Sequence, residues 1–286
     1  MVSFKKNPEE SIKQEIERFV AESPGNRKSQ PEAGSYFEKP LVGFADADDP
    51  LFIEYKEIIG DFHLTPVEIL SKLFPRHSSS WNGASVISWI LPISKSTRQS
   101  NCKETRGPSP AWEQTRIHGE AFNNQLREYV VSFLSKQHGL AAAPMLSEIF
   151  GVHQSDKSGF CSNWSERHAA YAAGLGTFSL NRGLITRSGV AMRCGSVVTN
   201  LKFKPTSRSY KDYQEYCLFE NCGKCIHRCP AGAITKEGHD KDMCIMHIAE
   251  LMDESAEGYP GCGLCQTGVP CEAGIPKKIT TVNLSN

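Results

Sequence analysis

Apolar residues recur at helical spacing in three stretches of the chain. Residues 7–22 carry four apolar side chains on one helical face, and the pattern ends at a Ser-Pro-Gly-Asn sequence, so we predict an amphipathic helix there. Residues 66–74 begin with a proline and predict a short helix. Residues 119–139 repeat apolar positions through Phe122, Leu126 and Val130 and close on a glycine, which predicts a longer amphipathic helix.

The hydrophobic pattern changes in residues 84–93, which form a near-continuous apolar run rich in β-branched and aromatic side chains. Such a run predicts a buried strand of a sheet. Residues 163–174 are rich in alanine and end on a glycine, and we predict a helix there with Ser165 as its N-cap. Residues 184–186 and 195–201 predict two further strands.

Two stretches rich in turn-forming and polar residues interrupt this pattern. Residues 23–50 are rich in Pro, Gly, Ser and Asp and predict irregular chain. Residues 204–213, KPTSRSYKDY, predict a polar linker that precedes a cysteine-rich region. We therefore place a domain boundary there, with one domain over residues 1–205 and a second over residues 206–286.

Length and charge restrict the possible classes. A chain of 286 residues with 39% apolar content can bury one large core or two modest ones. The 32 basic and 32 acidic residues balance, so bulk charge does not predict a nucleic-acid-binding protein. The N-terminal segment MVSFKKNPEESIKQEIERF reads as a charged amphipathic helix rather than a signal peptide, and no apolar run is long enough to span a membrane. We predict a cytoplasmic protein with no membrane partner.

Cysteines gather near the C-terminal end of the sequence. Eight of the eleven lie in the last quarter of the chain. A cytoplasmic chain of this length does not need a disulfide framework, so the clustering favours metal binding. These eight cysteines are Cys217, Cys222, Cys225, Cys229, Cys244, Cys262, Cys265 and Cys271.

The spacing of these cysteines predicts two 4Fe-4S clusters. Cys222, Cys225 and Cys229 with Pro230 match the end of the C-x2-C-x2-C-x3-C-P run of two-cluster ferredoxins, in which the cysteine before proline binds the other cluster. If this crossing holds, one cluster is bound by a Cys217 set, comprising Cys217, Cys222, Cys225 and Cys271. The other cluster is bound by a Cys229 set, comprising Cys229, Cys244, Cys262 and Cys265. Zinc bound by four thiolates is the alternative, because structural zinc sites also use C-x2-C pairs.

Two spacings depart from the ferredoxin pattern. Four residues separate Cys217 from Cys222, and Phe219 stands where a two-residue gap would place the cysteine. The gap before Cys271 is enlarged too, in CQTGVPC. Both altered ligands belong to the Cys217 set, so we predict that one cluster has a remodelled binding loop.

The segment ERHAAYAAGLGTFSLNRGLIT, followed by GSVVTNL and the cysteine-rich region, resembles epoxyqueuosine reductases and the catalytic cores of reductive dehalogenases. Both families have an E-R-x-A-x-x-A-G-L-G-like segment before a strand and two clusters, and the resemblance covers about residues 84 to 275. It implies an α+β fold, with a nitroreductase-like domain that binds cobalamin, followed by a bacterial ferredoxin-like domain that holds the two clusters.

The same resemblance implies that the loop after the E-R helix contacts the corrin and its nucleotide tail. Its glycines would let the backbone approach a large flat ligand. Ordinary turns are the alternative reason for these glycines. The predicted cofactor contacts are Gly174, Leu175, Gly176, Thr177, Phe178, Ser179, Asn181, Gly183, Thr186, Ser188 and Gly189.

The expected proton donors of epoxyqueuosine reductases are absent from this sequence. Phe160 and Cys161 occupy the region of the Asp, and Phe122 stands near the position of the Tyr. We therefore do not expect tRNA as a partner. By their position near the presumed active face, the candidate catalytic residues are Cys161, His118, Glu120 and Arg193.

Other polar residues of this region have structural explanations. We expect Glu166 and Arg167 to pair with each other or with neighbours, and His168 to be a surface or hydrogen-bonded histidine. We expect Cys102 and Cys194 to be thiols without a metal.

The sequence thus predicts an oxidoreductase that passes single electrons through two clusters to a corrinoid, from cob(II)alamin to cob(I)alamin. Its partners would be a corrinoid or a small-molecule substrate, and an electron donor such as ferredoxin or flavodoxin. Two alternatives are an electron-transfer protein that reactivates corrinoid proteins, and a ferredoxin-like protein with flavin or no second cofactor. A closed cavity with a titratable group would favour a substrate-reducing enzyme, whereas an open or aromatic-filled face would favour electron delivery.

Overall fold

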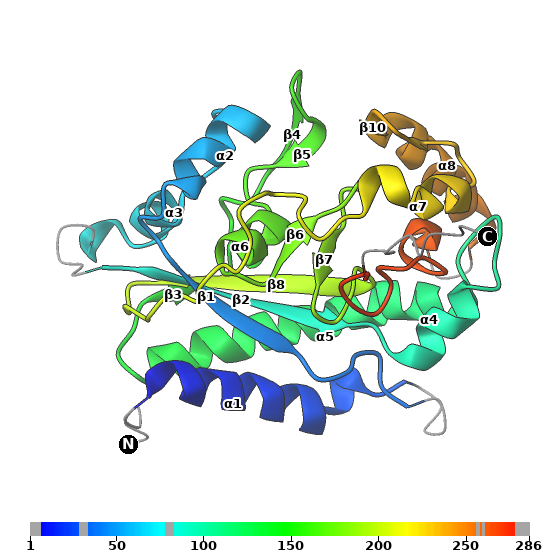
Figure 1. Cartoon of the computed structure of the whole chain (residues 1–286). Coiled ribbons are helices and arrows are strands. Elements are labelled where there is room, and N and C mark those ends of the chain that lie inside the picture. Colours follow the sequence, from blue (N-terminus) through cyan, green and yellow to red (C-terminus); the bar gives the residue numbers. More distant parts are fainter. Residues whose placement is uncertain (1–6, 29–33, 78–82, 256–257, 259–260, 278–286) are drawn as a thin grey trace, which may run out of the picture.

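The computed structural model describes residues 7–28, 34–77, 83–255, 258 and 261–277. Helices and short antiparallel strands are mixed along the chain, as in an α+β fold (Figure 1). The helices are α1 (Pro8–Glu22), α2 (Leu51–Ile59), α3 (Pro66–Leu73), α4 (Lys95–Asn101), α5 (Pro110–Ser135), α6 (Glu166–Ala172), α7 (Lys224–Arg228) and α8 (Lys241–Glu254). The strands are β1 (Leu41–Asp46), β2 (Ser85–Pro92), β3 (Ala141–Ala142), β4 (Val152–Ser155), β5 (Gly159–Ser162), β6 (Gly176–Phe178), β7 (Leu184–Thr186), β8 (Met192–Thr199), β9 (Ile234–Thr235) and β10 (Gly238–His239).

The central sheet has four antiparallel strands in the order β1-β2-β8-β3. Strand β2 pairs with β8 along its whole length, from Ser85 opposite Thr199 to Pro92 opposite Met192. Every residue of β2 is buried, as the unbroken apolar run of residues 84–93 predicts. Three two-stranded ribbons, β4-β5, β6-β7 and β9-β10, complete the sheets of the described residues.

The core is divided between the two faces of this sheet. Ile87 and Trp89 of β2 pack with apolar side chains of α1 and α5, whereas Val86 and Ile90 pack with those of α2, α3 and α6. This alternation follows from the two-residue period of a strand. Figure 1 shows α1 and α5 on one side of the sheet and α2, α3 and α6 on the other.

Most of the predicted elements are confirmed. The helices predicted at 7–22, 66–74 and 163–174 correspond to α1, α3 and α6, and the strands predicted at 84–93 and 184–186 correspond to β2 and β7. Strand β8 begins three residues before the predicted range 195–201. It ends two residues earlier than predicted.

The prediction of irregular chain over residues 23–50 is wrong at β1. This strand contains Gly43, and glycine is uncommon inside strands. A Cβ at this position would lie 2.3 Å from the carbonyl oxygen of Ala173, the residue that follows α6. The helix predicted from residue 119 begins instead at Pro110, because the side chain of Ser109 accepts a hydrogen bond from Trp112 N and caps the helix.

The cysteine-rich region packs on the end of the central domain near α4 and α5. The Arg228 guanidinium donates to the carbonyls of Glu104 at 2.9 Å and Asn101 at 3.2 Å. The Trp112 indole of α5 donates to the Gly261 carbonyl at 3.0 Å. These bonds fix the thiol-bearing loops against the end of the sheet, while the division at residue 205 stays a prediction. Among the described residues, no helix is long and apolar enough to cross a membrane.

Candidate metal and cofactor site

The four thiols of the Cys217 set lie around one small cavity. Three of them, Cys217, Cys225 and Cys271, pack against the apolar cluster of Ile185, Val190 and Val269. Burial and, after it, the neighbouring thiols Cys217, Cys225 and Cys222 together raise the pKa of Cys271 to about 12. Burial and, after it, Cys217 and Cys222 together raise the pKa of Cys225 to about 11. Such mutual effects require sulfur atoms that lie close together.

The four thiols of the Cys229 set form a second group. Burial raises the pKa of Cys262 to about 11, and Cys244 and Cys229 act in the same direction. Burial also raises the pKa of Cys265 well above its ordinary value, with added contributions from Cys262, Cys244 and Cys229. All four thiols line a large cavity of about 1150 Å³. Cys225 acts on Cys265 as well, so the two sets adjoin each other.

Two thiol-bearing loops have the same backbone form. In C-G-x-C at 222–225, Gly223 has a φ of 62° and a helical turn follows; in C-G-x-C at 262–265, Gly263 has a φ of 66° and a helical turn follows. These left-handed positions suit glycine. A Cβ on Gly263 would also lie 2.1 Å from the Trp112 ring. The repeated loop form presents paired thiols in the same way to each set.

The chemistry of these donors fits an iron-sulfur cluster. Each set supplies four thiols, which raise one another's pKa values in the absence of metal. Thiols of this kind bind a cationic centre as thiolates, and they release their protons when they do so. Within the described part of the chain, no three His, Cys, Asp or Glu side chains converge closely enough to hold a single metal ion. The assignment of each sulfur to a cluster stays a prediction.

Phe219 lies between the two cavities. It lines both the small cavity of the Cys217 set and the large cavity. Its φ of 40° is a strained value for an aromatic residue, and the enlarged gap after Cys217 contains it. The extra residues of this loop therefore place an aromatic ring between one set of thiols and the cofactor-sized space.

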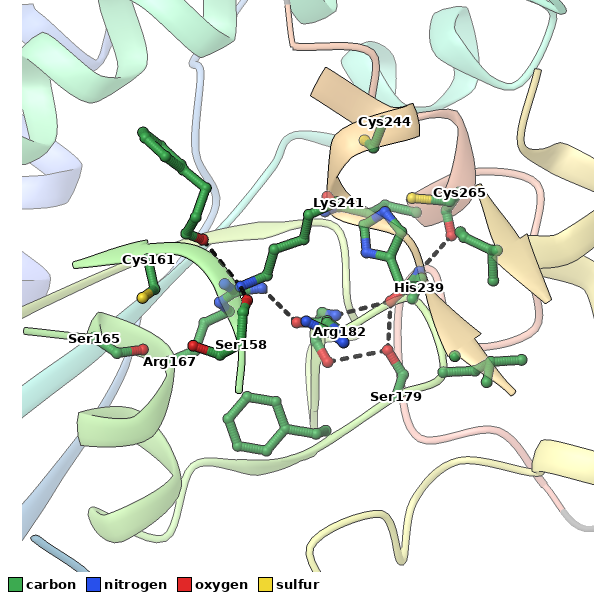
Figure 2. Close-up of a pocket in the computed structure, with 18 of the residues that line it drawn as sticks. Ser158, Cys161, Ser165, Arg167, Ser179, Arg182, His239, Lys241, Cys244 and Cys265 are labelled. Carbon is green, nitrogen blue, oxygen red and sulfur yellow. Dashed lines mark hydrogen bonds between the residues drawn. The ribbon is translucent and has the colours of Figure 1, made fainter. Parts of the chain in front are cut away.

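Four of the predicted cofactor contacts line the large cavity: Phe178, Ser179, Asn181 and Gly183. Asn181 fixes this loop, since its Oδ1 accepts from Gly183 N at 2.9 Å and its Nδ2 donates to the Cys265 carbonyl at 2.7 Å. The Ser179 hydroxyl also donates to Asn181 Oδ1, so hydrogen bonds link Ser179 to Cys265 through Asn181 beside the cavity (Figure 2). The loop is thereby tied to the Cys229 set.

The other predicted contacts lie behind this wall. A Cβ on Gly176 would meet the Ile185 carbonyl oxygen at 2.2 Å, and one on Gly189 would meet the Glu272 carbonyl oxygen at 2.1 Å. Packing against the protein's own backbone explains these glycines, and a role toward a corrin stays a prediction. The remaining predicted contacts do not line the large cavity either, and their role toward a corrin also stays a prediction. They are Gly174, Leu175, Thr177, Thr186 and Ser188.

Two of the predicted catalytic residues, Cys161 and Arg193, line the large cavity. The Cys161 thiol donates to the His153 carbonyl at 3.6 Å across the β4-β5 ribbon. Glu120 stands behind Arg193, with 3.7 Å between its Oε2 and the Arg193 Nε. The His118 ring on α5 lies 6.2 Å from that of Tyr36. Arg193 and Glu120 thus form an ion pair, Cys161 lines the same cavity as Arg193, and His118 does not line it.

Glu166 pairs with a neighbour, as predicted, whereas Arg167 does not pair with it. The Glu166 carboxylate accepts from Arg127 at 3.2 Å and from Ser196. The Arg167 guanidinium instead donates to the Arg182 carbonyl and faces the large cavity. The Arg167 side chain has protein on all sides, and its accessible surface faces the interior of the cavity.

Three polar residues of the cavity wall were not among the predicted site residues: His168 was given a structural role, and Arg182 and Lys241 were missed. His168 Nδ1 lies at 2.7 Å from the Ser165 hydroxyl in a hydrogen bond, and the centre of its ring lies 4.7 Å from that of Phe178. Burial lowers its pKa well below the ordinary value, and Arg167 lowers it further. Arg182 and Lys241 also line the cavity, and no motif in the sequence connects them.

Cys102 and Cys194 are placed differently from the eight clustered cysteines. The Cys102 thiol donates to the Glu272 carboxylate at 3.1 Å. Burial raises the pKa of Cys194 to about 12, so this thiol is protonated under ordinary conditions. Their predicted lack of a metal is left untested.

Comparison with known proteins finds likeness in structure. No protein-family profile and no curated protein matches the sequence. Two reductive dehalogenase structures, one of them the catabolic enzyme NpRdhA, are 13% and 14% identical to the chain, with TM-scores of 0.52 and 0.51. Each covers 82% of this chain, which spans 30% of the dehalogenase.

Epoxyqueuosine reductases are matched as well. One, solved with an epoxyqueuosine-modified tRNA stem loop, is 18% identical and covers 94% of this chain and 67% of its own, with a TM-score of 0.49. Another, from Streptococcus thermophilus, is 19% identical with a TM-score of 0.45, over 94% of this chain and 68% of its own. The chain therefore shares the fold of the matched part of the reductive dehalogenases, which fits a divergent member of the group that its sequence resembles.

Proposed function

We propose that this protein is an oxidoreductase that passes single electrons through two 4Fe-4S clusters to a corrinoid bound in the large cavity, where an organic substrate is reduced. One observation carries the proposal: eight thiols fall into two sets of four, and one set lines a cavity of about 1150 Å³. One matched dehalogenase structure is described as suggesting a mechanism for B12-dependent dehalogenation, which supports the choice of cofactor.

The size and lining of the cavity fit a corrinoid. Pockets for small ligands are usually about 300 to 1,000 Å³, so this one suits a large cofactor together with a substrate. Phe178 and Tyr213 supply aromatic surface, and Asn181 and Ser179 supply polar groups on the wall nearest the Cys229 set. Cobalamin, when bound, supplies a metal centre that accepts single electrons and reacts with organic molecules.

The two thiol sets define a direction for the electrons. The Cys229 set lines the large cavity, whereas the Cys217 set surrounds the smaller cavity beside it. We infer that an external donor such as ferredoxin or flavodoxin reduces the Cys217 cluster, and that the Cys229 cluster delivers each electron to the cavity. The thiols of both sets are partly buried, and partial shielding from water favours clusters of low potential.

The cavity wall favours a substrate-reducing enzyme over an electron-delivery protein. Cys161 and Lys241 both line the cavity, and each has a proton that it can give to a bound molecule. A protein that only delivers electrons needs no such groups. Cys161 occupies the region where epoxyqueuosine reductases have their Asp, so we assign it as the first candidate for a proton donor.

Metal and cofactor analysis tests this function. Anaerobically reconstituted protein is expected to contain about eight iron and about eight sulfide per chain, because two cubane clusters require them. After incubation with cobalamin and, separately, with flavin, the protein is expected to keep about one corrinoid per chain through gel filtration and to lose the flavin. The absorbance spectrum of the protein fraction measures both.

Each alternative has its own outcome in the same experiment. Zinc in place of iron would refute the cluster assignment. Full iron and sulfide with retained flavin, or with no retained cofactor, would refute the corrinoid function and support a ferredoxin-like protein. A retained corrinoid that is reduced but passes electrons to no small molecule would support the reactivating protein instead.

A further inference from the structure

The large cavity concentrates positive charge in a chain whose net charge is zero. Six Arg and Lys side chains line it, against two Glu side chains, Glu54 and Glu237, which are both exposed. The excess is gathered where three segments meet: Arg167 on α6, Arg182 in the loop after β6, and Lys241 at the start of α8. A gathering of cations inside a cavity favours an anionic ligand.

We propose that Arg167, Arg182 and Lys241 form a binding site for an anionic group, a carboxylate or a phosphate, of the molecule held in the cavity. Figure 2 shows these three side chains and His239 grouped on one wall. The structure assigns no carboxylate partner to any of the three within the described part of the chain. Unpaired cations that share a wall repel one another until an anion lies between them.

Backbone carbonyls hold two of these cations, Arg167 and Lys241, in place. The Arg167 guanidinium donates to the Arg182 carbonyl, so the two arginines are adjacent although 15 residues separate them. The Lys241 ammonium donates to the carbonyls of Ser158 and of Phe160, the latter at 3.0 Å. Carbonyl oxygens orient these groups without neutralising them, so their charge stays available to a ligand.

The titration of neighbouring groups reflects this positive field. Burial lowers the pKa of Lys241, and Arg182 and Arg167 lower it further, while Cys161 and Asp242 act in the opposite direction. Burial also lowers the pKa of His239, and Arg182, Arg167 and Lys241 act in the same direction. The charges of Arg167 and Arg182 therefore lower the pKa values of both Lys241 and His239, as expected for groups that share one site.

The choice of ligand chemistry follows from the side chains. Two guanidinium groups can each give two parallel hydrogen bonds to a carboxylate or phosphate, and the ammonium adds a point charge. The Cys229 set and Cys161 line the same cavity. An anion bound here would hold the rest of its molecule near the thiol and the proposed cluster, so we assign the substrate to the class of small organic anions.

Phosphate titration tests this site without a corrinoid. Full-length protein with its clusters, but no corrinoid, is titrated with inorganic phosphate in a calorimeter. Wild-type protein is expected to bind one phosphate, and Arg182→Gln and Lys241→Gln are each expected to weaken binding about tenfold, the size of one charge-assisted hydrogen bond. Arg182→Lys keeps the charge but loses the paired hydrogen bonds of the guanidinium, so it is expected to bind phosphate more weakly than wild type and more tightly than Arg182→Gln.

A matched control lies on the rim of the same cavity. Lys157 lines it too, and its ammonium donates to the Glu57 carbonyl at 3.0 Å, so Lys157→Gln removes one charge outside the proposed site. We expect this variant to bind phosphate within about twofold of wild type. Wild-type protein that binds no phosphate, or a Lys157→Gln variant as weak as Arg182→Gln, would overturn the proposal. Unchanged iron content in each variant shows that the fold is intact.

Two sources could supply the anion, and loading the cavity separates them. If phosphate still binds to cobalamin-loaded protein, the site receives a substrate. If cobalamin blocks phosphate but cobinamide, which lacks the nucleotide phosphate, does not, the site holds the tail of the corrinoid. Both outcomes support an anion site. The naming of the molecule rests on the proposed function, whereas the phosphate titration does not, so retained phosphate binding with no corrinoid retention would refute the function alone.

Discussion

Cys217→Ala is expected to cost the protein about four of its eight iron atoms while the other cluster stays intact. The physical reason is the grouping of the thiols: Cys217 acts on Cys225 and Cys271, and these lie around one cavity. A cubane that loses one of four thiolates in a partly exposed loop is readily lost. Iron and sulfide content, together with the electron paramagnetic resonance spectrum of the reduced protein, measures the loss.

Reciprocal variants make this prediction specific. Cys271→Ala is expected to give the same spectrum as Cys217→Ala, although 54 residues separate the two positions. Cys229→Ala is expected to remove the other signal, because Cys229 acts on Cys244, Cys262 and Cys265. Cys102→Ala, whose thiol is bonded to Glu272, is the control and should keep all the iron. Different spectra for the Cys217 and Cys271 variants would refute the crossed assignment.

The grouping of these thiols is a case in which sequence spacing predicts three-dimensional proximity. Within C-x2-C and C-x3-C the chain is too short to separate the sulfur atoms far, so local geometry decides their position. The partner across the crossing, Cys271 beside Cys217, follows from the ferredoxin-like pattern rather than from distance along the chain. Because local geometry and pattern agree, the grouping could be predicted from the sequence.

The elements that the sequence missed depend on tertiary contacts. Strand β1 looks irregular because of its flanking turn residues, yet Gly43 is required where α6 crosses the strand. The start of α5 was placed too late because the apolar period is weak near Pro110, while the Ser109 cap was available as a signal.

The polar wall of the cavity could not be predicted for a different reason. Arg182 and Lys241 are 59 residues apart and share no motif, so their proximity depends on how α8 packs against β5, where the Lys241 ammonium donates to the Phe160 carbonyl. Two glycines near the β6-β7 loop have a structural explanation that the sequence left open. The sequence predicts a close approach of the backbone to a ligand, and at Gly176 and Gly189 the backbone of the protein itself fills the space where a Cβ would lie.

The cavity also depends on a buried ion network beneath it. The Arg127 side chain is 1% exposed and contacts Glu120 at 2.8 Å and Glu166 at 3.2 Å. It also donates to the Cys194 carbonyl of β8 at 3.2 Å. The network therefore joins α5 to α6 and β8, and α6 carries Arg167 and His168 into the cavity. Arg127 therefore contributes both to the stability of the fold and to the position of the α6 side chains in the cavity.

Arg127→Met is expected to lower the free energy of unfolding by about 3–5 kcal/mol, because it leaves the Glu166 carboxylate buried without its partner. The chemical-denaturation midpoint of anaerobic protein measures the loss. Arg18→Met is the control: Arg18 is 51% exposed in its ion pairs with Glu15 and Glu22, and its removal should cost at most about 1 kcal/mol.

The pH dependence of this variant identifies the cause. Burial raises the pKa of Glu166 even beside Arg127, so the folded protein holds a proton there more tightly than the unfolded chain does. A carboxyl whose pKa is raised by folding loses stability as the pH rises from its unfolded toward its folded value. Without Arg127 this pKa rises further, so the deficit should grow as the pH rises above the ordinary range of a carboxyl group. Adding Glu166→Gln should remove this dependence and restore part of the stability, since a neutral amide costs less to bury. A deficit that does not change with pH and is unchanged by Glu166→Gln would mean that Arg127 acts through packing alone.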